Sequence, residues 1–195
     1  MHKKHLKEGN DKFSKYVWQT YFRKFKEDRD LFATLDKDQQ EEIYKLIERC
    51  ASASEIYRFA NYIKDANISR LEDMIIKIND AEYIYHFAED VKGANIHKLE
   101  DAIIETNDAE YIYYFAWFVK NANIHKLEDA IIETNDAEHI IYFALNIKNA
   151  NIQKLEDAII ETNNAKYIYY FAHNIRRADK KRLMQIYKEL RRGGK

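Results

Sequence analysis

The sequence predicts an all-α protein: a right-handed α-solenoid of tandem helical-hairpin repeats with an N-terminal helical cap and a basic C-terminal capping helix. Three observations support this fold class. The 195-residue chain has no proline and only four glycines, so residues that interrupt helices are scarce. The sequence of residues 95–110 recurs unchanged at 123–138, which sets a period of 28 residues. Within each period, two segments carry apolar residues at spacings of three and four, as amphipathic helices do.

The 28-residue register extends well beyond the identical segment. One column contains only phenylalanine, namely Phe59, Phe87, Phe115, Phe143 and Phe171. Another contains only leucine, namely Leu71, Leu99, Leu127 and Leu155. We expect these columns to be buried, because helices this short are marginal alone and depend on stacking against their neighbours.

The unit that begins at Asn95 illustrates the expected hairpin. Its first helix follows an Asn95 cap, with Leu99 and Ile103 on the buried side. Glu100 and Asp101 are expected on the polar side, and because this acidic pair recurs in every full unit it does not indicate an active site.

The second helix of that unit is expected to begin at Asn107 and to run to about Lys120. Asn107 and Glu110 have the spacing of a reciprocal capping box. Its expected buried stripe consists of Ala109, Ile112, Phe115, Ala116 and Val119.

Three segments follow from this pattern. Residues 1–50 are predicted to form a helical cap with a basic disordered start, residues 51–178 the repeats, and residues 179–195 a basic helix and tail. The C-terminal helix is expected to start near Arg176, where the repeat pattern breaks.

Two cap helices are expected, in residues 11–29 and 37–50. The first has apolar residues at helical spacing, namely Phe13, Tyr16, Val17, Tyr21 and Phe25. The second is expected to be capped by Asp38 and Glu41.

The units at residues 93–116, which read Gly-Ala-Asn-Ile-His-Lys-Leu-Glu-Asp-Ala-Ile-Ile-Glu-Thr-Asn-Asp-Ala-Glu-Tyr-Ile-Tyr-Tyr-Phe-Ala, resemble short helical-hairpin repeats of bacterial and phage proteins. More loosely they resemble the HEAT and armadillo class of α-solenoids. The resemblance covers roughly residues 51–178 and implies a scaffold that presents a binding surface. The units are shorter than HEAT units and lack their proline, so the resemblance transfers no catalytic or ligand-binding residue.

The sequence offers little for catalysis, cofactors or metals. Too few glycines are present for a phosphate-binding loop. His97 and His125 share a column that Ser69 and Gln153 occupy in other units, so no metal site is expected there. We therefore expect a protein that is not an enzyme and that needs no cofactor.

The location predicted from the sequence is the cytoplasm of a bacterial or phage-infected host cell. The single cysteine, Cys50, excludes an intrachain disulfide and fits a reducing compartment. The longest apolar run, residues 111–119, is too short to span a bilayer, so no membrane association is expected.

Charge is distributed unevenly along the chain. Residues 1–30 carry a net charge of +4 and residues 176–195 a net charge of +7, whereas residues 31–175 carry −12. An acidic repeat body of this kind favours a partner with a basic surface.

Surface aromatics narrow the expected contact area. Positions 117 and 118 share columns with Glu89 and Asp90, which indicates that these columns face solvent. In one unit they hold Trp117 and Phe118, residue types that dominate binding hot spots. The predicted partner-binding residues are Tyr114, Trp117, Phe118, Tyr142 and Leu145, with Glu110 and Glu138 at the rim.

The first functional hypothesis is a non-enzymatic module that binds a protein or ribonucleoprotein with a basic surface. Its narrowest version is a phage-type inhibitor of a nucleic-acid-binding defence complex, similar to an anti-CRISPR protein. The second is direct nucleic-acid binding through basic terminal residues: Lys3, Lys4, Lys7, Arg176, Arg177, Lys180, Lys181, Arg182, Arg191 and Arg192. A HEAT-like DNA-repair enzyme is a distant third, and a homo-oligomer formed through the basic helix is also open.

Overall fold

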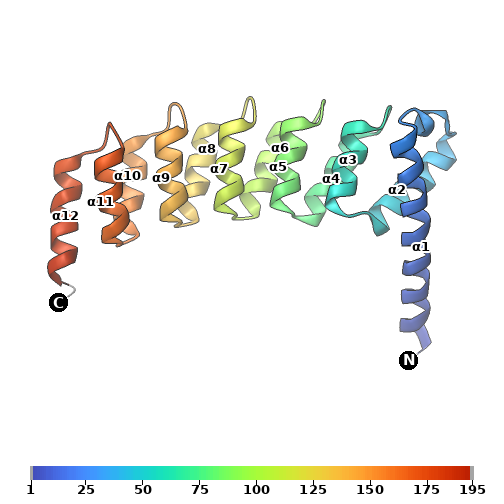
Figure 1. Ribbon diagram of the computed structural model, residues 1–195, viewed down its shortest axis with the longest axis horizontal. Coiled ribbons are helices and arrows are strands. Elements are labelled where there is room, and N and C mark those ends of the chain that lie inside the picture. The colour runs from blue at the N-terminus through green and yellow to red at the C-terminus, as the bar shows by residue number, and fades with distance from the viewer. Residues whose placement is uncertain (1, 194–195) are drawn as a thin grey trace. The chain divides into compact units, whose positions relative to one another are not determined.

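The structure is a computed structural model that describes residues 2–193, with side chains described for residues 12–192 (Figure 1). The described residues form helices and no strand. Contacts divide the chain into two compact units, residues 1–95 and residues 96–195. The predicted all-α fold of packed helical repeats is confirmed.

The first unit contains a long helix, a 3-10 helix and four shorter helices. They are α1 (His2–Glu27), η1 (Leu31–Thr34), α2 (Lys37–Cys50), α3 (Ala53–Tyr62), α4 (Ile68–Ile78) and α5 (Ala81–Asp90). Its core includes a cluster of phenylalanine rings. The Phe32 and Phe59 ring centroids lie 5.2 Å apart, and the Phe25 ring lies 5.6 Å from that of Phe59.

The apolar residues of α1 that stand at helical spacing do not all lie on one buried face. Phe13 and Tyr16 are 67% and 69% exposed, whereas Trp18 and Phe25 are fully buried. α2 and α3 pack against α1, and the Trp18 indole N–H donates to Glu55 of α3 at 3.1 Å, so the face of α1 that carries Trp18 is buried. Helical spacing alone does not tell which of two apolar stripes a neighbouring helix covers.

The cap of α2 is also placed differently. Asp36 is the N-cap, with its side chain accepting a hydrogen bond from the backbone of Gln39 at 2.8 Å. The Gln39 side chain in turn accepts from the Asp36 backbone at 3.1 Å. The predicted pair of Asp38 and Glu41 is therefore wrong by two residues.

The second unit contains seven helices. They are α6 (Ile96–Glu105), α7 (Ala109–Phe118), α8 (Ile124–Glu133), α9 (Ala137–Asn146), α10 (Ile152–Glu161), α11 (Ala165–Asn174) and α12 (Lys180–Gly193). Within this unit α6, α8 and α10 pack in one row and α7, α9 and α11 in a second (Figure 1). We call them the first-row and second-row helices.

The repeat columns form the core between the two rows. Phe115, Phe143 and Phe171 are fully buried, as the register predicts. Leu127 and Leu155 are fully buried as well. Each helix from α6 to α11 is only ten residues long, so this shared core supplies most of the stability that these helices lack individually.

Asparagine occupies turn positions of the kind that glycine or proline occupies in many other proteins. Asn107, Asn135 and Asn163 adopt left-handed backbone conformations with φ of 53°, 53° and 52°. Asparagine tolerates this region better than other non-glycine residues. Asn107 is thus the turn residue, and the N-cap of α7 is Asp108, whose side chain accepts from the backbone of Glu110 at 3.1 Å. The predicted capping box of Asn107 and Glu110 is wrong.

A column of buried glutamates joins successive repeats. Glu100 and Glu128 are each 1% exposed, although amphipathic spacing places them on the polar side. The Asn123 backbone N–H donates to Glu100 at 2.6 Å. The Asn151 backbone N–H donates in the same way to Glu128, also at 2.6 Å. Burial of the carboxylate is tolerated because it satisfies the N-cap backbone of the next repeat.

The same kind of hydrogen bond occurs at two further glutamates, one in each unit. In the first unit the Asn95 backbone N–H donates to Glu72 at 2.7 Å. In the second unit the Asp179 backbone N–H donates to Glu156 at 2.7 Å. Since Asp179 immediately precedes α12, this last helix occupies a first-row position.

The C-terminal helix therefore continues the register. It starts at Lys180, four residues after the predicted start at Arg176. Leu183 is fully buried, one period after Leu155. Basic composition masks this continuity in the sequence.

No helix among residues 2–193 combines the length and the apolar character needed to cross a membrane.

Candidate partner-binding surface

The predicted aromatic residues lie on the outer side of α7 and α9. Trp117 and Phe118 are each 48% exposed, at the C-terminal end of α7. Leu145 and Tyr142 on α9 are also exposed, and Tyr114 is half-buried. The predicted exposure is confirmed for the first four, and their role in binding stays a prediction.

Ring contacts make these side chains one continuous group. The Trp117 and Phe118 rings stack with centroids 5.1 Å apart. Tyr113, which is buried, lies 5.2 Å from Trp117 and 6.0 Å from Tyr142, and so joins α7 to α9. Its hydroxyl accepts a hydrogen bond from the Asn146 side-chain amide at 2.9 Å. Contact on several sides restricts the rings before any partner arrives.

The rim glutamates are bonded to tyrosines of the same helix. The Tyr114 hydroxyl donates to Glu110 at 2.9 Å, and the Tyr142 hydroxyl donates to Glu138 at 2.6 Å. Each hydrogen bond to a carboxylate raises the pKa of its tyrosine, so both hydroxyls stay protonated donors above their ordinary range. A carboxylate accepts several hydrogen bonds, so each glutamate keeps acceptor capacity for a partner.

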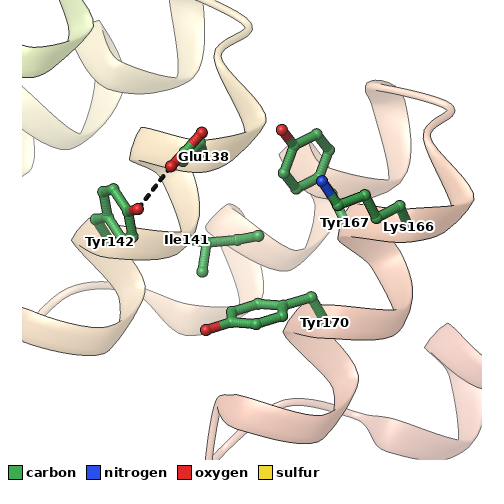
Figure 2. Close-up of a pocket in the computed structure, with 6 residues that line it drawn as sticks. All are labelled: Glu138, Ile141, Tyr142, Lys166, Tyr167 and Tyr170. Carbon is green, nitrogen blue, oxygen red and sulfur yellow. Dashed lines mark hydrogen bonds between the residues drawn. The ribbon is translucent and has the colours of Figure 1, made fainter.

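A pocket of about 210 Å³ lies between α9 and α11 (Figure 2). Its walls are Glu138, Ile141, Tyr142, Lys166, Tyr167 and Tyr170. In Figure 2 the rings of Tyr142, Tyr167 and Tyr170 stand around the opening, with Glu138 on the α9 side. Aromatic rings and a carboxylate are the groups that attract a cationic side chain.

Lys166 lies at this pocket in a position that breaks the repeat. It stands in the column of Glu110 and Glu138, and its ammonium lies 5.1 Å from the centre of the Tyr167 ring. The pocket rings therefore already contact one cation of the chain itself.

Sequence reasoning missed Tyr167 and Tyr170. Tyr170 is 47% exposed and follows Tyr142 by one period, so the 28-residue column was the signal that could have found it. We define the aromatic surface as Tyr114, Trp117, Phe118, Tyr142, Leu145 and Tyr170.

A basic column at the hairpin tips also escaped the sequence analysis. Lys120, Lys148 and Arg176 follow the second-row helices at intervals of one period, and all are exposed. The second-row outer side thus has carboxylates near the N-termini of α7 and α9, rings between there and the C-terminal ends of these helices, and cations beyond the C-termini. Charges of these signs also complement the helix dipole.

The predicted basic residues of the C-terminus divide into two groups. Arg182 is engaged with Asp157 at 2.6 Å and with buried Glu156 at 3.1 Å, because it stands in a column that pairs with the preceding repeat. The others are exposed: Arg176, Arg177, Lys180, Lys181, Arg191 and Arg192. The side chains of Lys3, Lys4 and Lys7 lie outside those described.

One group of metal-ligating side chains was not anticipated. Donor atoms of His86, Glu89 and Asp90 on α5 lie within 4.8 Å of one another. Asp90 also accepts a hydrogen bond from the Tyr57 hydroxyl at 2.6 Å. Two of the three groups are exposed, as acidic helix ends commonly are, and we assign no metal to them.

The chain matches no protein-family model, no curated protein and no solved structure.

Proposed function

We propose that this chain is a protein-binding module whose aromatic surface docks on a partner with basic side chains. The observation that carries the proposal is the exposed, ring-connected group of Trp117, Phe118 and Tyr142. Large exposed aromatics of this kind are the residues that supply most of the energy in protein interfaces. Repeat scaffolds commonly present such surfaces from successive units.

In the pocket beside Tyr142, Glu138 on the α9 side supplies the preference for a cation, whereas Lys166 on the α11 side carries the same sign of charge as the proposed partner. A partner lysine or arginine that enters between Tyr142 and Tyr170 meets ring faces and the carboxylate of Glu138. Cation–π contacts contribute roughly 0.5 to 2 kcal/mol, more when water is excluded. Glu110, which extends the acidic rim on α7, favours the same sign of partner.

The experiment is affinity capture from nuclease-treated lysate, comparing the natural chain with the variant Trp117→Asp with Phe118→Asp. A control, Phe13→Asp with Tyr16→Asp, removes two aromatics of α1 that are even more exposed than Trp117 and Phe118. We expect a basic protein that the natural chain and the control retain and that the first variant loses. Equal retention by all three proteins contradicts the proposal.

The proposed pocket contact has its own test. With the captured protein in hand, Glu138→Gln and Tyr170→Ala are each expected to weaken affinity, by up to about 30-fold at a hot spot worth about 2 kcal/mol. Measuring the dissociation constant at several salt concentrations checks whether charge contributes, because salt weakens attraction between exposed charges.

The inhibitor version of the proposal concerns the identity of the partner. Its prediction is that nucleic acid and this chain compete for one basic surface of the captured protein. Binding that persists unchanged when that protein is saturated with nucleic acid contradicts this version and leaves the module proposal intact.

A further inference from the structure

A second cavity lies at the hairpin tips, away from the rings of the first pocket. It is an open pocket lined by the turn between α9 and α10, the turn between α11 and α12 and the ends of the adjoining helices, with a volume of about 430 Å³. Its polar wall consists of Asn146, Lys148, Asn149, Asn174, Arg176 and Arg177. No carboxylate is among the lining residues that the structure describes.

The three cations of this cavity differ from those on the first-row helices. Lys126, Lys154 and Arg182 each pair with an aspartate of the preceding repeat. Lys148, Arg176 and Arg177 form no ion pair with any described residue. Their charge is thus left for a ligand or for solvent.

The helix dipole accounts for one cation at each tip. Lys120, Lys148 and Arg176 all follow a helix C-terminus, where positive charge is favourable. Arg177 adds a second cation at the tip after α11, at a position where the two preceding repeats have Asn121 and Asn149.

The turn at Arg177 also departs from the others. Asn121 and Asn149 are left-handed, with φ of 64° and 69°, whereas Arg177 is not among the residues with positive φ. At this single tip two arginines are adjacent, and both line the cavity together with Lys148 from the neighbouring tip.

The geometry points to a binding site for a phosphate group in this cavity, formed by Arg176, Arg177 and Lys148. Guanidinium groups offer paired donors that match two phosphate oxygens, and an ammonium adds a point charge. The backbone phosphate of a single-stranded nucleic acid and a free phosphate compound share this chemistry. The basic column that continues to Lys120 favours the nucleic-acid source, because a polyanion contacts successive tips.

The test measures fluorescence anisotropy of a labelled 20-nucleotide single strand with the full chain across a salt series. The variant Arg176→Gln with Arg177→Gln is compared with Lys180→Gln with Lys181→Gln, which removes equal charge from the neighbouring helix. Each lost phosphate contact lowers the salt slope by about 0.7, so the arginine variant is expected to lower it by about 1.4. Its affinity is expected to fall more than that of the lysine variant.

Competition with inorganic pyrophosphate distinguishes the two sources. Displacement of the strand by pyrophosphate at comparable phosphate concentration identifies a free phosphate compound as the ligand, and failure to displace it identifies the nucleic-acid backbone. The inference is overturned when neither the strand nor pyrophosphate binds at low salt, or when the arginine and lysine variants lose affinity equally. Unchanged circular dichroism melting shows that the exposed substitutions leave the fold intact.

Discussion

The two rows of helices in residues 96–195 differ in how far they repeat. In the first row, α6 and α8 have the same sequence, and α10 differs from them only at Gln153. In the second row, the buried Phe and Ala columns repeat, but the outer positions change from Trp117 and Phe118 on α7 to Leu145 and Asn146 on α9.

The contacts explain this difference. First-row polar groups are committed to the adjacent repeat, as in the hydrogen bond from the Asn151 backbone to Glu128 and the ion pair of Lys154 with Asp129. A change at any of these positions disturbs stacking. The outer positions of the second row make fewer such contacts with the adjacent repeat, so their residues can vary. We therefore place the binding surface there.

The largest effect is expected where the second row is identical. Phe143→Ala empties a fully buried position and should lower the free energy of unfolding by about 3 to 5 kcal/mol. Its neighbour Tyr142→Ala removes a partly exposed ring and its hydrogen bond to Glu138, and it should change this free energy by less, about 1 kcal/mol. Urea denaturation measures both, and similar losses from the two variants contradict the division into core and outer columns.

A smaller effect is expected in the glutamate column of the first row. Glu128→Ala leaves the Asn151 backbone N–H without its acceptor and should cost about 1 to 3 kcal/mol. Glu128→Gln keeps a carbonyl oxygen at the site and should cost less. Thermal unfolding compares the three proteins, and an alanine variant as stable as the natural chain shows that the buried glutamate is not a structural link.

The exposed ion pairs of the first row should matter less. Asp129→Asn removes the carboxylate that Lys154 contacts, and both side chains are about half exposed. Exposed pairs contribute roughly 0 to 1 kcal/mol. A double-mutant cycle of Asp129→Asn and Lys154→Met should give a coupling energy within that range, and it should shrink as salt is added.

A structural role is also expected for Tyr57 of the first unit, and it should appear as a dependence of stability on pH. In the first unit, burial and then the hydrogen bond to Asp90 raise the pKa of Tyr57 to about 12. Because an unfolded tyrosine ionises near pH 10, the folded state retains a proton that the unfolded state loses between pH 10 and about 12. This contribution to stability is present below pH 10 and is lost as pH rises through that interval.

Tyr57→Phe tests this assignment. The natural chain should lose more stability than the variant between pH 10 and about 12, measured as the difference in melting temperature at each pH. Parallel pH profiles for the two proteins contradict it.

The sequence pattern predicted the buried apolar columns of the repeats, but it did not predict the hydrogen bonds that join one repeat to the next. The Phe143 and Leu127 columns follow from periodicity alone, because burial of an apolar column needs no knowledge of its neighbour. The burial of Glu128 does not follow from periodicity, because a glutamate is expected on the polar side of a helix. Only the structure shows that the backbone N–H of the next repeat donates to it. The α1 face around Trp18 lies outside the repeat and had no column to guide it.

The candidate site was predictable to a similar degree. Charge in the columns of Trp117 and Phe118 revealed their exposure. The pocket at Tyr170 forms where two helices meet, and the cavity at Arg177 forms where two turns meet. The sequence of one segment reveals neither. Summing charge over long segments also concealed the lysines at the tips and the engagement of Arg182 with Asp157.

The most direct test of the central claim uses the two tryptophans of the chain. Trp117 is 48% exposed and Trp18 is fully buried, so iodide quenching of tryptophan fluorescence reports mainly on Trp117. We predict that a saturating amount of the protein captured on the aromatic surface protects Trp117 of the natural chain from iodide. A Phe118→Asp control should no longer bind that protein, so adding it should leave the melting temperature of the control unchanged. Quenching of Trp117 that is identical with and without the bound protein contradicts the claim that the outer face of the second row is the binding surface.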